Sequence, residues 1–186
     1  MSDLMIGDYI ENIKSALEHK PNDAVFIGFD CVFYKKFKSF SHWDYTTTDL
    51  HSPLADVKAD ICALPFEDNS YDLILCNHVL EHIPNDLKAM KELYRVLKPR
   101  GTAILQVPLE EGRENTFEDD SIIDQQERTR IFGQYDHVRV YGQDYYNRLQ
   151  KAGFKVTPVD YIKEVTEGDI KRFALPTERI PVVTKK

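Results

Sequence analysis

A cluster of polar residues directly follows an apolar run, and its residue types could support chemistry. Residues 73–76 read as a buried strand, and Asn77, His78, Glu81 and His82 come immediately after it. In an open α/β sheet, ligands bind at the carboxyl ends of the strands. Imidazole exchanges protons near neutral pH more readily than other side chains. We therefore expect Asn77 and His78 to line a ligand site, with His78 as a candidate catalytic base, whereas a structural role is the simpler interpretation of His82.

Two aspartates follow other apolar runs. Asp49 lies 21 positions after Gly28, close to the spacing of about 20 residues at which a carboxylate binds the ribose hydroxyls of a nucleotide cofactor. Asp60 precedes Ile61, and such a pair can bind the amino group of adenine and pack against its ring. Both aspartates could instead be loop carboxylates, and spacing alone leaves the two alternatives open.

The same cluster also invites a metal interpretation. His78, Glu81 and His82 form an HxxEH pattern, which is the inverted form of a zinc-protease motif. That motif needs a long helix and a further ligand, but Pro84 follows almost at once. We therefore predict no metal here.

The elements that must position these residues follow from hydrophobic periodicity. Apolar runs predict strands at residues 24–29, 45–50, 57–62, 71–76, 102–107, 154–161 and 180–184. Helical spacing predicts helices near residues 6–17, 31–40, 87–97, 124–132 and 145–152. Alternating strands and helices favour right-handed crossovers and an α/β fold, with a parallel sheet covered by helices on both faces.

Local signals mark the ends of several elements. Asn85 is a typical helix N-cap, and Gly153 is typical of a helix C-terminus. The run Lys-Pro-Arg-Gly at residues 98–101 predicts a turn. Pro181 lies in the last predicted strand and suits an edge position better than a central one.

A mostly polar segment at residues 109–140 follows the fifth predicted strand, where an insertion would cover the mouth of the site. Its first half is acidic, and near its end Tyr135, His137, Arg139 and Tyr141 occupy alternate positions. This alternation predicts an extended segment with one polar and aromatic face, and therefore a lid suited to a small molecule. His137 would be a second candidate base, or it would only hold the lid in place.

Composition restricts the function classes. The 186 residues fit one domain, with 42% hydrophobic and 30% charged residues. A net charge of −7 and the lack of a basic run argue against nucleic acid. No apolar stretch reaches the ~20 residues of a membrane span, and no secretory signal is recognisable. The three cysteines lack CxxC spacing, so we expect reduced thiols in a cytoplasmic protein.

Several pieces of the sequence together resemble a known family. They are Asp60 with Leu-Pro-Phe at 64–66, Tyr-Asp at 71–72, HVLEH at 78–82, and ELYRVLKP at 92–99 followed by Gly101. As an ensemble they resemble class I S-adenosylmethionine-dependent methyltransferases of the type 11 group. The resemblance implies one domain over residues 1–186 with a Rossmann-like α/β fold. Its sheet would be seven-stranded and mostly parallel, with the last strand antiparallel and helices on both faces, and S-adenosylmethionine would be the cofactor.

The resemblance also assigns cofactor-binding residues by position. Asp49 would bind the ribose, Asp60 and Ile61 the adenine, and Asn77 and His78 the methionine side. One departure concerns the glycine-rich loop of the family, since only one glycine stands here and a bulky phenylalanine follows it. The complete implied set is Gly28, Phe29, Asp30, Asp49, Leu50, Asp60, Ile61, Asn77 and His78.

Three functions compete. The first is an S-adenosylmethionine-dependent methyltransferase acting on an unidentified small molecule. The second is a catalytically inactive, methyltransferase-like binding protein with an altered glycine-rich loop. The third, a nicotinamide oxidoreductase, is disfavoured because the sequence lacks GxGxxG. Titration with S-adenosylmethionine and its demethylated product separates the first two.

Overall fold

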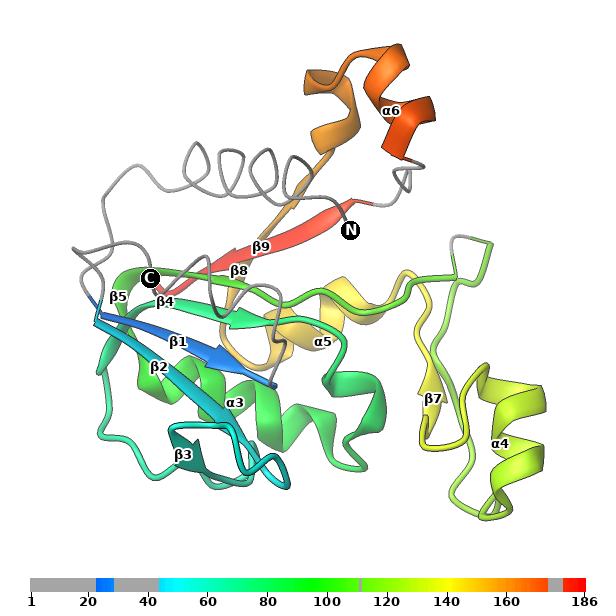
Figure 1. Ribbon diagram of the computed structural model, residues 1–186, viewed down its shortest axis with the longest axis horizontal. Coiled ribbons are helices and arrows are strands. Elements are labelled where there is room, and N and C mark those ends of the chain that lie inside the picture. Colours follow the sequence, from blue (N-terminus) through cyan, green and yellow to red (C-terminus); the bar gives the residue numbers. More distant parts are fainter. Residues whose placement is uncertain (1–22, 29–43, 111, 174–178) are drawn as a thin grey trace.

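The computed structural model describes residues 23–28, 44–110, 112–173 and 179–186. They form a seven-stranded sheet with helices packed on it, and a two-stranded unit that projects from one end (Figure 1). The elements in chain order are β1 (Asp23–Ile27), β2 (Asp44–Asp49), β3 (Val57–Lys58), β4 (Tyr71–Cys76), η1 (Leu80–His82), α3 (Asp86–Val96), β5 (Leu97–Ile104), β6 (Phe117–Glu118), α4 (Gln125–Phe132), β7 (Arg139–Val140), α5 (Tyr145–Lys151), β8 (Lys155–Val159), η2 (Tyr161–Glu164), α6 (Glu167–Phe173) and β9 (Ile180–Thr184).

The sheet has the strand order β3-β2-β1-β4-β5-β9-β8. Strand β1 pairs in parallel with β2 and β4, and the β2–β3 and β4–β5 pairs are also parallel. Strand β9 runs antiparallel to both of its neighbours, β5 and β8. This confirms the predicted fold: a seven-stranded, mostly parallel sheet whose last strand is antiparallel.

Helices α3 and α5 lie together on one face of the sheet (Figure 1). Helix α3 starts as predicted, because the side chain of Asn85 accepts a hydrogen bond from the Lys88 amide at 3.0 Å. Its apolar side buries Met90, Leu93 and Val96 completely, and this packing closes the core beneath β4 and β5. The helices expected near residues 6–17 and 31–40 lie outside the described residues.

One predicted strand and one predicted turn need correction. Strand β3 is two residues long, because residues 59–63 turn instead: the Ala63 amide donates to the Asp60 carbonyl at 2.9 Å. The turn predicted at residues 98–101 lies inside β5. The pairing of β5 with β4 is irregular there, because the register shifts between Tyr71 and Leu73 of β4. There the backbone reaches a positive φ of 66° at Arg100.

Strand β9 was expected to suit an edge, and this is wrong, because it lies between β5 and β8. Pro181 faces Pro158 across the β8–β9 pair, so two residues without an amide hydrogen stand opposite each other. On the other side the Pro181 carbonyl accepts from the Leu105 amide at 3.3 Å. The proline therefore still contributes its acceptor to the sheet.

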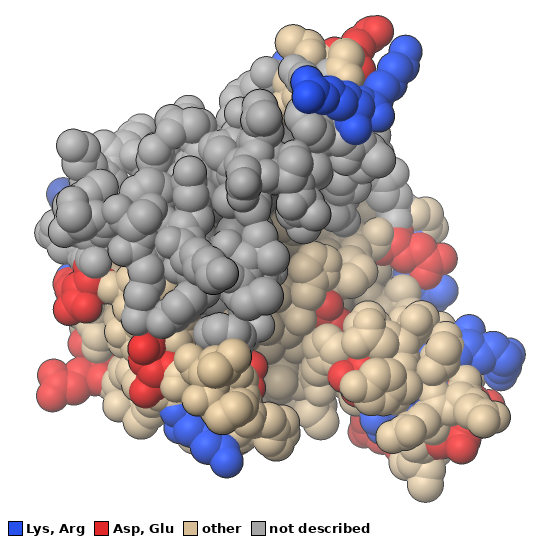
Figure 2. All heavy atoms as spheres, in the orientation of Figure 1, with Lys and Arg blue, Asp and Glu red and all other residues tan. Residues whose placement is uncertain are grey.

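The insertion, residues 109–140, forms a lobe beside the sheet, with α4 and the β6–β7 pair (Figure 1). Helix α4 follows the prediction, with Asp124 as N-cap accepting from the Glu127 amide at 2.9 Å. On the face shown in Figure 2, described Lys and Arg side chains are interspersed with acidic and uncharged ones. No helix in the described part of the chain is long and apolar enough to cross a bilayer.

Candidate functional site

The carboxyl ends of three adjacent strands, β2, β1 and β4, meet at one edge of the sheet. Ile27 of β1 is paired with both Thr48 of β2 and Cys76 of β4. The Gly28 amide then donates to the Thr48 carbonyl at 2.9 Å. As a result Gly28 and Asn77, which follow their strands, lie at the same level of the sheet as Asp49, the last residue of β2. This is the position where α/β folds bind ligands. Parallel pairing thus brings Asp49 and Asn77 to one edge, as expected for the ends of neighbouring parallel strands.

Gly28 is required by the backbone at the end of β1. Its φ is +85°, a conformation that side chains rarely adopt, and a Cβ atom there would lie 2.8 Å from Cγ2 of Val79. The end of β1 therefore closely approaches the segment after β4, which suits a loop that brings its backbone to a ligand. Phe29 and Asp30, the other predicted residues of this loop, lie outside the described residues.

The carboxylate of Asp49 has a fixed orientation at the end of β2. Its Oδ1 accepts hydrogen bonds from the amides of His51 and Ser52, both at 2.7 Å. Leu50, the residue between Asp49 and His51, is 46% exposed. A carboxylate held in this way, next to an exposed apolar side chain, can present charge and apolar surface to a nucleoside together.

Asp60 and Ile61 differ in their surroundings. Asp60 is exposed, and its Oδ1 accepts from the Cys62 amide at 2.8 Å. Ile61 is only 5% exposed and belongs to the core, so its side chain offers little surface to a ligand. Burial raises the pKa of the Cys62 thiol, and the nearby Asp60 raises it further. Cys62 and Cys76 are free thiols; Cys31 is not among the described residues.

His78 has a strained backbone at the end of β4. Its φ is +55°, a left-handed conformation that costs a non-glycine residue about 1–3 kcal/mol and that clusters at functional sites. The amide of His78 donates to the Gln106 carbonyl at 2.8 Å, which ties the ends of β4 and β5 together. Its ring is 55% exposed, with Nδ1 at 3.5 Å from Oε1 of Glu81. The structure therefore presents the His78 ring at the strand end.

The insertion brings His137 to the residues that follow His78. The rings of His82 and His137 pack edge to face, with centroids 4.6 Å apart. The Val138 amide donates to the Glu81 carbonyl at 3.0 Å, which fixes the insertion against η1. Sequence reasoning treated His82 as structural and did not assign Glu81. The HxxEH pattern was the sequence signal that could have drawn attention to both Glu81 and His82. As predicted, no long helix forms at this motif, because η1 ends at His82.

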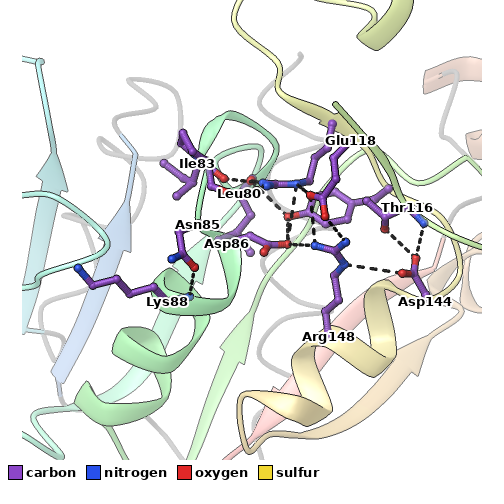
Figure 3. A network of polar contacts seen from close by, with 12 residues as sticks. Leu80, Ile83, Asn85, Asp86, Lys88, Thr116, Glu118, Asp144 and Arg148 are labelled. Atoms are coloured by element: carbon purple, nitrogen blue, oxygen red, sulfur yellow. Dashed lines mark hydrogen bonds and ion pairs between the residues drawn. The ribbon is translucent and has the colours of Figure 1, made fainter. Parts of the chain in front are cut away.

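A partly buried ionic network docks the insertion onto the sheet domain (Figure 3). Asp86, at the start of α3, accepts from Arg148 and from the Tyr141 hydroxyl, both at 2.9 Å. Arg148 also binds Glu118 of β6 at 2.8 Å. Burial and the adjacent Asp86 charge raise the pKa of Tyr141 well above its ordinary value, so its hydroxyl remains a donor.

Arg139 completes the network from β7. Its side chain is 3% exposed, and its guanidinium donates to Glu118 at 2.9 Å and to the carbonyls of Leu80 at 3.0 Å, Pro84 at 2.8 Å and Ile83. These carbonyls surround the end of η1, which carries Glu81 and His82. The predicted extended face is therefore wrong in part: residues 135–136 form a turn with Tyr135 exposed, whereas Arg139 and Tyr141 are buried.

Comparisons of sequence place the chain among known proteins. A methyltransferase-domain family matches residues 29–105. An uncharacterized protein of Methanocaldococcus jannaschii is 31% identical over 169 residues, which are 84% of this chain and 74% of that protein. A demethylmenaquinone methyltransferase of Staphylococcus epidermidis is 44% identical over 48 residues, which are 26% of this chain and 20% of that enzyme. The chain thus matches about a fifth of the length of that enzyme.

Comparisons of structure point to the same fold. An S-adenosylmethionine-dependent methyltransferase from Mesorhizobium loti has a TM-score of 0.64 at 13% identity, covering 96% of this chain and 98% of the other. The 1,6-didemethyltoxoflavin-N1-methyltransferase of Burkholderia thailandensis has a TM-score of 0.61 at 13% identity, covering 96% and 76%. That structure holds 1,6-didemethyltoxoflavin and S-adenosylhomocysteine. At such identities the likeness shows the fold alone.

Proposed function

The chain belongs to the methyltransferase-domain family, and we propose that it is a single-domain enzyme that transfers a methyl group from S-adenosylmethionine to a small molecule. The observation that carries the proposal is the shared strand-end edge. There a glycine whose Cβ would collide with Val79, an oriented Asp49 carboxylate and the strained His78 lie on adjacent strands. The cofactor would supply an electrophilic methyl group.

The residues at this edge fit a nucleoside cofactor. Asp49 is the candidate acceptor for the ribose hydroxyls, because two backbone amides already fix one of its oxygens. Asp60 is exposed next to it in the sheet order and is the candidate acceptor for the adenine amino group. Asn77 and His78 follow β4, the next strand after β1, and would hold the methionine side. S-adenosylhomocysteine in a structural neighbour supports this choice of cofactor.

The docked insertion supports a small acceptor molecule. Arg139 and Tyr141 attach it to the segment after β4, so it stands as a wall beside the strand ends, and such a wall limits the size of the acceptor. Of the two histidines predicted to act as bases, we retain His78, whose ring is exposed at the strand end. His137 packs against His82 instead.

Calorimetric titration with S-adenosylmethionine and with S-adenosylhomocysteine tests the proposal. We expect saturable binding of both, and formation of S-adenosylhomocysteine when an acceptor library is added. His78→Asn should then lower turnover about 10²–10⁴-fold, because asparagine tolerates the positive φ while it removes the base. No binding at millimolar ligand would refute the enzyme and favour the inactive binding protein with an altered glycine-rich loop. Binding without transfer to any acceptor would also favour an inactive protein.

A further inference from the structure

Three side chains that the methyltransferase site does not use converge where the insertion meets η1. Glu81 and His82 are adjacent in η1, and His137 lies between α4 and β7. One potential donor atom from each of the three lies within 4.8 Å of the other two. The backbone bond from Val138 to Glu81 and the contacts of Arg139 hold the two segments together. The cluster is therefore built by docking and not by a chance approach of flexible side chains.

Both imidazole rings have one nitrogen committed to an acceptor. Nδ1 of His137 lies 3.1 Å from the Phe132 carbonyl oxygen, and Nδ1 of His82 lies 3.3 Å from Oδ2 of Asp136. An acceptor at Nδ1 favours the tautomer with the proton on Nδ1, which leaves the lone pair on Nε2. Histidines that bind metal are oriented in this way, by a carbonyl or a carboxylate on the second ring nitrogen.

The third member is a buried acid. The Glu81 side chain is 2% exposed, and its Oε2 has no hydrogen-bond partner among the described residues. A buried carboxylate oxygen without a donor is costly, because it loses its hydration and gains nothing in return. A cation bound at this oxygen would remove that cost. The acid thus points to a ligand independently of the two histidines.

We propose that Glu81, His82 and His137 bind one divalent first-row transition-metal ion. Two neutral imidazoles and a carboxylate suit Zn²⁺ and related ions, whereas Mg²⁺ and Ca²⁺ prefer oxygen donors alone. Bond lengths of about 2.0–2.2 Å put neighbouring donors roughly 3.5 Å apart, so the side chains close by about 1 Å on binding. Three protein ligands leave a position for water or for an oxygen atom of a substrate.

This ligand set differs from the one that the sequence argument rejected. The HxxEH pattern would use both of its histidines on one long helix, and such a helix does not form in the described residues. Here His137 of the insertion takes the place of His78, so a short η1 turn is sufficient. The ion would join the insertion to the end of β4, whether or not the chain transfers methyl groups.

Calorimetric titration of the full chain, stripped with a chelator and dialysed, tests the proposal. We expect one Zn²⁺ ion per chain and much weaker binding of Mg²⁺. His82→Ala and His137→Ala should each weaken Zn²⁺ binding by more than about 10-fold. Asp136→Asn removes the negative charge beside Nδ1 of His82 and should weaken binding by about 10-fold. The matched control is His51→Ala, because His51 is exposed and lies on a different loop.

Two further measurements distinguish a specific Zn²⁺ site from nonspecific Zn²⁺ binding at the protein surface. Circular dichroism checks the fold of each variant, and a thermal scan of the wild type should show a Zn²⁺-dependent rise in Tm that His137→Ala lacks. A stoichiometry well below one ion per chain would overturn the proposal. So would a loss of affinity in His51→Ala as large as in His82→Ala, because Zn²⁺ would then bind exposed histidines in general.

Discussion

Arg139→Met is the perturbation that most directly tests how the insertion is held. Arg139 is 3% exposed and donates to Glu118 and to the carbonyls of Leu80, Ile83 and Pro84. Methionine keeps the apolar stem but removes every donor. The carbonyl oxygens of Leu80, Ile83 and Pro84, around Glu81 and His82, would lose the guanidinium that donates to them.

The expected loss follows from what replaces these bonds. A hydrogen bond to a charged group contributes about 1.5–3 kcal/mol. The Leu80 carbonyl keeps the Tyr141 hydroxyl at 3.3 Å, Glu118 keeps Arg148, and water can reach the exposed Pro84. We therefore expect Arg139→Met to lower the free energy of unfolding by about 3 kcal/mol, which corresponds to one or two unreplaced hydrogen bonds to a charged group.

Denaturation with guanidinium chloride measures this loss, and a stability of about 5–15 kcal/mol would leave the variant folded. Arg130→Met is the matched control from the same insertion, since Arg130 is 73% exposed and lies 3.5 Å from Glu127. We expect a change below about 0.5 kcal/mol there. Equal effects of the two substitutions would refute the argument that Arg139 docks the insertion.

Three further predictions concern the strand ends and the network. Gly28→Ala should lower the free energy of unfolding by about 1–3 kcal/mol, because of the positive φ and because the new Cβ collides with Val79. Adding Val79→Ala should recover the part of this loss that the collision causes, as measured by denaturant unfolding. Asp49→Asn should weaken S-adenosylmethionine binding by about 1.5–3 kcal/mol in calorimetry, and unchanged affinity would move the ribose site elsewhere. Burial raises the pKa of Glu118, but hydrogen bonds from Arg148 and Arg139 outweigh it and the net pKa is lowered. A carboxyl with a lowered folded-state pKa stabilises fully above its unfolded value and loses this contribution as the pH falls. Unfolding measured below about pH 4.5 should therefore show a smaller acid-induced loss in Glu118→Gln than in the wild type.

Elements with strong local signals could be predicted from the sequence. Strand β4 has the predicted bounds, as does β9, Asn85 caps its helix as expected, and α4 lies within the predicted range of residues 124–132. In each case the deciding interaction lies within a few residues of the signal. A capping side chain reaches the third amide after it, and an apolar run needs only to be buried on both faces of the sheet.

Features that depend on distant partners could not be predicted. Arg139 alternates with aromatic residues in the sequence and therefore resembled one face of an exposed strand. Its partners at Leu80, Ile83 and Pro84 are 59, 56 and 55 positions away. No periodicity within the insertion encodes that a guanidinium will be buried among them, because its burial depends on the carbonyls that another segment offers.

The division of the molecule into a sheet domain and an insertion indicates which residues would determine specificity for the methyl acceptor. The sheet contributes Gly28, Asp49 and His78 at positions that the fold itself determines, since parallel strands end at one edge. In the proposed enzyme the acceptor side would depend instead on the insertion, which is held by ion pairs of Arg139 and Arg148 with Glu118 and Asp86. A relative could therefore keep the strand-end edge and change its acceptor by exchanging only the residues that dock and line the insertion. Among them, His137 would connect both halves through a shared ion.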